Sequence, residues 1–286
     1  MQQKNTPQLL PLALSQAVLF VVTWVALFVF SWLLTRSDEN FIATCIGVGF
    51  AQVNLAAAFL ALGTCTLIVR LEAAAVLITL AYLATVCSFT RTEEWEIYIG
   101  ILVGFLAEFV VIQTPLWLMR LGLGWRVDHS SRLSADESIS SRQFTIRELL
   151  ISTTVIAVLL AIARGAILSL SIGTLSQTRN QELQYIIALF SLMAGFNLLL
   201  AWPVIGAVLM ARGQVFTIPL VIAVAIAATY VEELVFSAIF GGGGTDVYHF
   251  FGLLNGSHFM LLLLAFGVAR GFGYRFAGKT NYGNNG

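Results

Sequence analysis

Apolar runs long enough to cross a lipid bilayer are the feature that most constrains this chain. The first extends from Leu12 to Leu34, LALSQAVLFVVTWVALFVFSWLL, and holds no charged residue. About 18 apolar residues in helical form span the hydrocarbon core of a membrane. This run is longer than the apolar core of a signal peptide and ends without a small-x-small cleavage site, so we expect a retained first transmembrane helix.

Charged or glycine-rich breaks divide the chain into eight apolar segments, at residues 12–34, 41–69, 73–89, 97–119, 149–171, 185–210, 215–240 and 250–269. We interpret Arg70 and Glu72 as the turn between the second and third segments, because residues 41–89 are too many for one span. Charged residues make up only 10% of the chain. Soluble domains carry about 25%, so this chain has too few to cover a water-facing surface. The sequence therefore predicts an all-α, polytopic membrane protein with about eight transmembrane helices.

The basic residues of the connecting segments predict the orientation. With a cytoplasmic N-terminus, the outer face receives only Arg36, Arg91 and Arg179. The cytoplasmic face receives eleven basic residues: Lys4, Arg70, Arg120, Arg126, Arg132, Arg142, Arg147, Arg212, Arg270, Arg275 and Lys279. Positively charged loops stay in the cytoplasm, so we expect both the N- and C-termini there, in the cell inner (cytoplasmic) membrane.

The chain divides into four parts on this topology. Residues 1–119 and 149–270 form two four-helix membrane groups, and no internal repeat relates them. The serine-rich segment 120–148 between them is predicted to be a flexible cytoplasmic linker. Residues 271–286 form a basic tail that we expect to be disordered.

Composition also limits the partners. A formal net charge of zero argues against nucleic-acid binding, which needs clustered positive charge. The lipid bilayer is the expected partner. Four residues are placed to contact anionic lipid headgroups, namely Arg142, Arg147, Arg270 and Arg275.

The three cysteines give no sign of a cofactor. Cys45, Cys65 and Cys87 have no metal-binding spacing, and we interpret them as small buried apolar residues. Cys45 and Cys87 fall near the same membrane face, which leaves a disulfide open. We predict no cofactor.

Ionisable residues inside the apolar segments are the main functional candidates, because charge is costly within a membrane. Glu108 lies roughly 16 Å below the outer end of its segment, near the bilayer midplane. Arg164, Glu232 and Glu233 fall in the outer third. Depth therefore favours an ion pair between Arg164 and one of the two adjacent glutamates. Neighbouring helical residues point about 100° apart, so only one glutamate can face a given partner.

Two histidines follow the glutamates. The four glycines at 241–244 cannot sustain a helix and allow the next segment to fold back. This places His249 and His258 in the same outer region, with His258 only a turn or two below the surface. We predict no metal site, although these two histidines are weak candidates for metal ligands.

The segment RQFTIRELLISTTVIAVLLAIAR, residues 142–164, resembles one that recurs in uncharacterised planctomycete membrane proteins. Its usual form there is Arg-Arg-Phe-Ser-Leu-Arg-x-Leu-Leu, followed by an apolar helix. The matching residues are Arg142, Phe144, Arg147, Leu149 and Leu150. The resemblance implies common ancestry and membrane entry, not an activity.

Glu232 and Glu233 and the histidine that follows are similar to the motif of the CAAX-type intramembrane endopeptidase family, Glu-Glu-x-x-x-Arg and then Phe-x-x-x-His. Ser237 stands at the arginine position, Leu254 stands at the phenylalanine position before His258, and no further histidine follows. The resemblance implies an intramembrane hydrolase. A carboxylate would act as base toward a bound water, with Glu232, Glu233 and His258 as candidate catalytic residues.

Three functions fit these features. A membrane scaffold or partner-binding protein is the default interpretation. It needs only close helix packing, for example along GILVG at Gly100–Gly104, and a structural ion pair of Arg164 with a glutamate. A proton- or cation-coupled transporter is the first alternative, with Glu108 or the glutamate pair as its coupling site. The candidates for lining its polar route are Gln52, Asn54 and Asn197. An intramembrane hydrolase is the second alternative.

Overall fold

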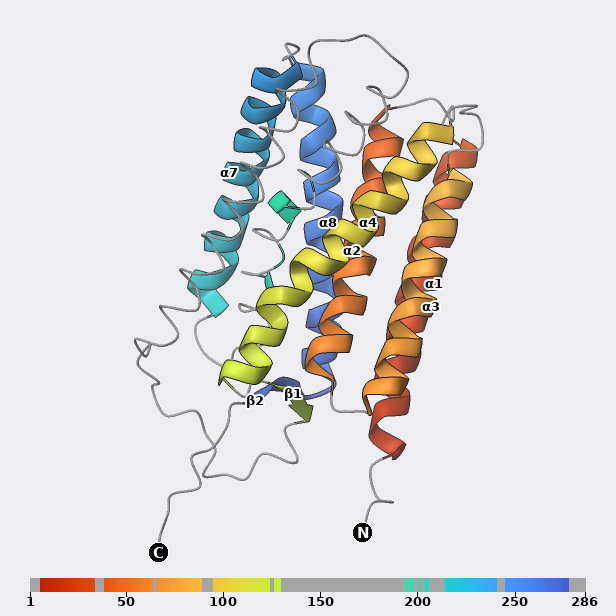
Figure 1. Cartoon of the computed structure of the whole chain (residues 1–286), viewed down its shortest axis with the longest axis vertical. Helices are drawn as coiled ribbons and strands as arrows, with labels where there is room; N and C mark the ends of the chain where they lie inside the picture. The colour runs from red at the N-terminus through yellow and green to blue at the C-terminus, as the bar shows by residue number, and fades with distance from the viewer. Residues whose placement is uncertain are drawn as a thin grey trace, which may run out of the picture.

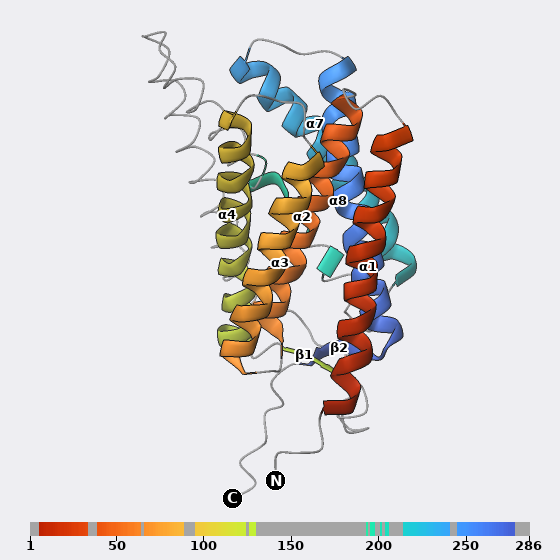
Figure 2. The ribbon, with the colours of Figure 1, turned by 90° about the vertical axis from the view of Figure 1, so that its right-hand side faces the viewer.

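In the computed structural model the chain forms a bundle of long helices that run alternately in opposite directions (Figure 1 and Figure 2). The structure describes residues 6–33, 39–63, 66–88, 95–123, 126–129, 193, 195–197, 201, 204–205, 214–240 and 245–277. The long helices are α1 (Thr6–Leu33), α2 (Glu39–Leu62), α3 (Leu67–Ser88), α4 (Trp95–Leu118), α7 (Gln214–Phe240) and α8 (Thr245–Gly271). A π-helical turn, η1 (Met119–Leu123), follows α4. Two short strands are β1 (Arg126–His129) and β2 (Tyr274–Ala277).

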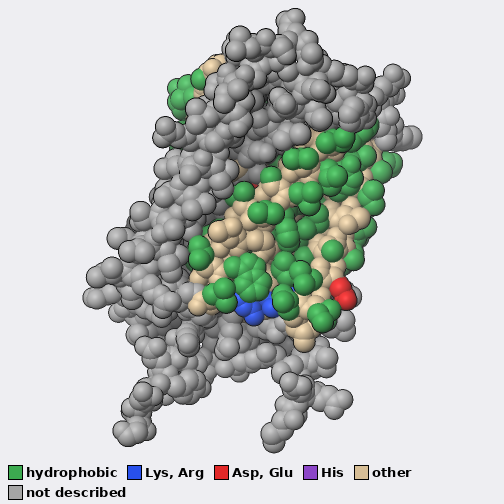
Figure 3. Space-filling view, in the orientation of Figure 1, with side chains coloured by type: hydrophobic (Ala, Val, Ile, Leu, Met, Phe, Trp, Pro, Cys, Tyr) green, Lys and Arg blue, Asp and Glu red, His purple; other side chains and the backbone are tan. Residues whose placement is uncertain are grey.

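Four helices in the described part of the chain are long and apolar enough to cross a membrane: Asn40–Leu62, Leu67–Ser88, Ile97–Leu121 and Val247–Gly271. Outward-facing side chains on these helices are largely hydrophobic, as the face in Figure 3 shows and as Ile68 and Val110 illustrate. Such a surface is suited to lipid rather than to water. The fold is helical as predicted, and these helices indicate a membrane protein.

The remaining predicted segments divide into two kinds. Segments 12–34 and 215–240 coincide with α1 and α7. Segment 149–171 and most of segment 185–210 lie outside the described residues.

Helix α2 is the centre of the bundle and makes its most extensive contacts with α8, α3 and α4. Its sequence, ENFIATCIGVGFAQVNLAAAFLAL, carries alanine or glycine on every side, which lets neighbouring helices approach closely. Gly47 faces the α8 backbone at the Leu254 carbonyl, and Gly49 faces the ring of Phe105 on α4. These small residues allow one helix to be enclosed by three others. Gly100 and Gly104 of α4 are buried as well.

The turn between α2 and α3 corrects the sequence prediction. Arg70 and Glu72 lie inside α3, and the break between the helices falls at residues 63–66. Arg70 is buried because its guanidinium group donates hydrogen bonds to the carbonyls of Leu60 and Ala61 at the end of α2. An arginine whose charge is held by helix-end carbonyls need not mark a loop.

A second arginine completes this cap. Arg120 donates hydrogen bonds to the carbonyls of Ala61 and, at 3.0 Å, Gly63. The guanidinium carbons of Arg70 and Arg120 lie 6.0 Å and 5.5 Å from the ring centroid of Trp117. The two guanidinium groups thus contact one aromatic ring and bind three backbone carbonyls. These interactions hold the end of α2 against α3 and α4.

The sequence does not predict the strands. β1 lies within the segment interpreted as a flexible linker, and β2 lies within the tail expected to be disordered. The strands pair antiparallel from Arg126 opposite Ala277 to His129 opposite Tyr274, with Asp128 opposite Arg275. Their pairing joins segments far apart in the chain, and each strand has only four residues. Local periodicity therefore gives no signal for it.

Two of the cysteines are described, and they differ in environment. Cys45 is buried, as predicted, whereas Cys87 is exposed on α3. Both are free thiols, so they do not form the disulfide that the sequence left open.

We predict that Gly47→Ala lowers the thermal stability of the purified protein in detergent by roughly 1–3 kcal/mol or more, because the added Cβ overlaps the Leu254 carbonyl. The matched control is Gly267→Ala on α8, where an added Cβ meets nothing within 4 Å. That variant should be as stable as the wild type or slightly more so. Equal melting temperatures for the two variants would contradict the close α2–α8 approach.

Candidate functional site

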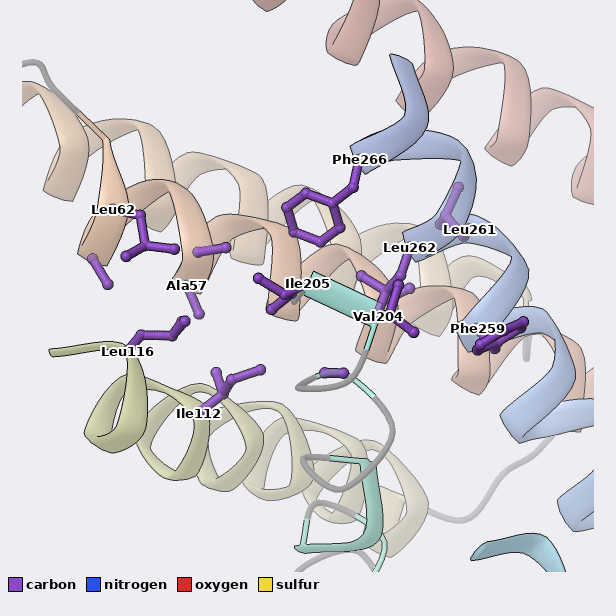
Figure 4. Packing of buried hydrophobic residues seen from close by; sticks show 14 of the residues in the cluster. Ala57, Leu62, Ile112, Leu116, Val204, Ile205, Phe259, Leu261, Leu262 and Phe266 are labelled. Atoms are coloured by element: carbon purple, nitrogen blue, oxygen red, sulfur yellow. The ribbon is translucent and has the colours of Figure 1, made fainter. Parts of the chain in front are cut away.

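A layer of polar side chains interrupts the apolar interior of the bundle. One apolar cluster lies toward the end where α2, α4 and α8 begin, and it includes Phe50, Ile101, Met193 and Phe251. A second cluster lies toward the end where these helices finish, and Figure 4 shows part of it. Its members include Leu62, Ile112, Val204 and Leu262.

Polar residues fall between the two clusters on each of these elements. We call the following set the polar layer: Asn54 of α2, Glu108 of α4, Asn197, Thr229 and Glu232 of α7, and Asn255 and His258 of α8. All seven side chains are buried. The sequence places ionisable groups in apolar segments, and the structure brings several of them to one level.

Glu108 lies at the centre of the polar layer and is fully buried. The amides of Asn54 and Asn197 lie beside its carboxyl group, and the Glu232 carboxyl is near enough to interact with it electrostatically. Neither Glu108 oxygen makes a hydrogen bond of normal geometry with the described part of the chain. Asn54 and Asn197, predicted as route-lining residues, are therefore neighbours of the predicted coupling acid.

His258 contacts Asn54 across the α2–α8 interface. The distance from Asn54 Nδ2 to His258 Nε2 is 2.7 Å. His258 lies further along its helix than the predicted segment start at residue 250 implies. Because α8 begins at Thr245, His258 lies about 20 Å along the helix axis, near the middle of α8. Its burial follows from this depth.

Glu232 is held by α8. Asn255 Nδ2 donates a hydrogen bond to Glu232 Oε2 at 2.7 Å and another to Thr229 Oγ1 at 3.1 Å. The prediction that adjacent glutamates diverge is confirmed, since Glu232 is 1% exposed while Glu233 is only partly buried.

Two of the other predicted site residues do not join the layer. His249 is exposed near the start of α8, and Glu233 lies on a different face of α7 from Glu232. The two carboxylates and two histidines of the hydrolase hypothesis are therefore not gathered at one point. Arg164 lies outside the described residues, so its ion pair with a glutamate stays a prediction.

Asn255 and Thr229 are the site residues that the sequence analysis missed. Asn255 precedes His258 by three positions, and Thr229 precedes Glu232 by three. Residues three apart share a helix face, so each is the polar companion of an ionisable residue already noted. This spacing is the signal that could have identified them.

Eight buried polar atoms of the layer make no hydrogen bond with the described residues. They are Asn54 Oδ1, Glu108 Oε1 and Oε2, Asn197 Oδ1 and Nδ2, Glu232 Oε1, Asn255 Oδ1 and His258 Nδ1. Buried polar groups normally have partners, because an unsatisfied one costs about 1–3 kcal/mol. This concentration of unpartnered polar atoms at one level makes the polar layer the candidate functional site.

In the described segments, no group of three or more His, Cys, Asp or Glu side chains is arranged to hold a metal ion. No protein-family model matches this chain, and no curated protein or solved structure matches it either. The resemblances to planctomycete membrane proteins and to CAAX-type endopeptidases stay predictions.

We predict an energetic coupling between Asn54 and His258. In a double-mutant cycle of Asn54→Ala and His258→Ala, the unfolding free energies should deviate from additivity by about 0.6 kcal/mol and by at most about 1.7 kcal/mol. A cycle of His258→Ala with Gln113→Ala is the control, because Gln113 donates its hydrogen bond to the Ala57 carbonyl instead. Unfolding titrations in mixed detergent measure both cycles. Additivity in both would show that the two side chains do not interact.

Proposed function

We propose that this chain is a membrane transporter in which the polar layer binds the proton or cation that drives transport. The observation that carries the proposal is the pair of buried carboxyl groups, Glu108 and Glu232, close enough to interact in a layer with unpartnered oxygens. Ionisable residues inside a membrane bundle typically mark substrate and ion pathways.

The unpartnered atoms favour this function over a packing role. A polar network that only fixes helix packing is stabilising when every member is hydrogen-bonded, and a partly satisfied network is worse than an apolar core. Among the described residues, neither the Glu108 oxygens nor the side-chain atoms of Asn197 make a hydrogen bond of normal geometry. The free-energy cost of leaving these atoms without hydrogen bonds is expected at a site that must bind and release a ligand.

The apolar clusters on both sides support a site closed to water at both ends. Phe105 of α4 belongs to one cluster and Ile112 of the same helix to the other, with Glu108 between them. A transporter must pass through such a closed state if the site is to open to one side at a time. Hydrocarbon on each side of the layer provides that barrier.

Helix α7 is the element best placed to open the layer. Among the described elements its main contacts are with α8 alone, whereas α2 packs against α8, α3 and α4. α7 carries Glu232, so a shift of α7 separates the two acids. Asn54, Glu108, Asn255 and His258 stay on the more extensively packed helices α2, α4 and α8, while Thr229 moves with α7.

The topology that we propose has eight spans with both termini in the cytoplasm of a cell with an inner (cytoplasmic) membrane. α4 ends and α7 begins at the same end of the bundle (Figure 1), which requires an even number of crossings between them. Predicted segments 149–171 and 185–210 supply two. Five buried residues are spaced as one face of a helix in the second of these segments: Met193, Asn197, Ala201, Val204 and Ile205.

Charge supports the same orientation. Arg70 and Arg120 cap α2 at the end of the bundle that carries β1 and β2. Arg126 and Arg275 belong to these strands, and Arg270 lies in the last turn of α8. We place this end in the cytoplasm by the positive-inside rule, with Arg270 and Arg275 near anionic lipid headgroups. Arg142 and Arg147, proposed for the same role, lie outside the described residues.

We predict that Glu108→Gln and Glu232→Gln each reduce cation-gradient-driven proton flux at least tenfold in liposomes containing the purified protein, since neither amide can carry the charge. Glu233→Gln is the matched control and should transport like the wild type, because Glu233 lies outside the layer. A pH-sensitive dye inside the liposomes, with sodium or potassium gradients imposed, measures the flux. Wild-type flux no greater than that of protein-free liposomes would contradict the transport function.

The topology makes a separate prediction in a cysteine-free background. Single cysteines introduced as Ser134→Cys and Asn284→Cys should react with a membrane-impermeant thiol reagent only from the cytoplasmic side. Ser176→Cys should react only from the opposite side. Labelling of Ser134→Cys and Asn284→Cys from different sides would overturn the eight-span arrangement.

A further inference from the structure

We infer that the polar layer binds a compact monovalent cation directly, with Glu108 as its anionic ligand. This inference rests on the proposed transport function and names the class of its substrate. It is carried by the chemical type and the placement of the unpartnered atoms.

The unpartnered atoms are mainly oxygens. Six of the eight are oxygens of carboxyl or amide groups, contributed by Asn54, Glu108, Asn197, Glu232 and Asn255. Carboxylate and amide oxygens are the ligands of hard cations, and they also accept hydrogen bonds from protonated amines. A small cation is therefore complementary to this site, and an anion is repelled by its two acids.

Glu108 and Glu232 have different roles in this arrangement. Glu232 Oε2 already accepts a hydrogen bond from Asn255. Neither oxygen of Glu108 makes a hydrogen bond of normal geometry with the described residues, and the Asn54 and Asn197 amides lie beside them. Glu108 is thus the acid whose whole carboxylate is available to a ligand, with amide oxygens on two sides.

Asn197 provides a second observation, from a residue that carries no charge. Its side chain is fully buried and lies beside Glu108, and neither of its polar atoms makes a hydrogen bond of normal geometry with the described residues. Burying an amide group without a hydrogen-bond partner or a ligand destabilises the fold. Its oxygen can contact the same cation as Glu108.

Charge and space restrict the cation further. One monovalent cation neutralises the Glu108 carboxylate, which removes most of the cost of that charge at mid-bundle. The layer lies between two packed apolar clusters that include Phe105 and Ile112 of α4, so we expect a compact ion to bind in preference to a bulky quaternary amine. An alkali metal ion and a small protonated amine share this chemistry.

The test measures the melting temperature of purified full-length protein in detergent against increasing lithium, sodium, potassium or methylammonium chloride. Choline chloride keeps the ionic strength constant and is the bulky control. We expect a saturable rise in melting temperature with at least one compact cation and none with choline. The alkali and methylammonium series distinguish a metal ion from an amine.

Variants locate the site. Asn197→Ala and Glu108→Gln should each weaken the saturable binding about tenfold or more, while Glu233→Gln should bind like the wild type. If Glu108→Gln does not fold, Glu108→Asp keeps the charge and should change the order of preference among the cations. Unchanged binding in both Asn197→Ala and a folded Glu108 variant would overturn the inference.

This test separates the inference from the proposed function. A cooperatively melting wild type with no saturable dependence on any compact cation, but with Glu108-dependent proton flux, overturns the cation site and leaves transport standing. Saturable cation binding lost in Asn197→Ala, without flux in liposomes, supports the cation site and removes the transport function.

Discussion

The close approach of α2 to α8 and α4 is the constraint on which the rest of the structure depends. Glycine at positions 47 and 49 removes the side chains that would hold these helices apart. Asn54 lies about two turns further along α2, and its short side chain reaches His258 at 2.7 Å and lies beside Glu108. Larger residues at the two glycines would widen the interface and withdraw this contact. Packing of small residues thus determines where the polar groups meet.

The polar layer and the apolar clusters around it depend on each other. Two buried acids within interaction range destabilise the bundle unless protons, cations or fixed dipoles compensate them. The clusters on either side supply the packing that keeps the helices together despite this cost. Their hydrocarbon also lowers the local dielectric constant, which strengthens electrostatic interactions within the layer. A site with this composition stays assembled because most of the bundle around it is apolar.

Sequence reasoning succeeded where the signal is local and failed where it depends on contacts between helices. Hydropathy predicted the helices at 97–119 and 215–240, and the 100° rotation between neighbours predicted that Glu232 and Glu233 diverge. The same hydropathy placed Arg70 in a turn. Hydropathy gives an arginine the same value whether it caps a neighbouring helix or lies in a loop, so it cannot distinguish the two cases. His258 lies further along α8 than the apolar segment implies, because α8 begins before that segment does, at Thr245. The β1–β2 pair leaves no periodic pattern in two strands of four residues.

The strand pair and the helix contacts hold the described parts of the layer to different extents. β1 follows α4, β2 follows α8, and their antiparallel pairing ties the ends of these two helices. Tyr274 of β2 is buried, and Val127 of β1 packs against the apolar cluster below the layer. Glu108 and His258 therefore lie on helices restrained at a common end. Glu232 lies on α7, which no described strand restrains and which, among the described elements, packs mainly on α8. Separation of Glu232 from Glu108 is accordingly the rearrangement of the layer that disrupts the fewest described contacts. It is also the one that changes the electrostatic interaction between the two acids most.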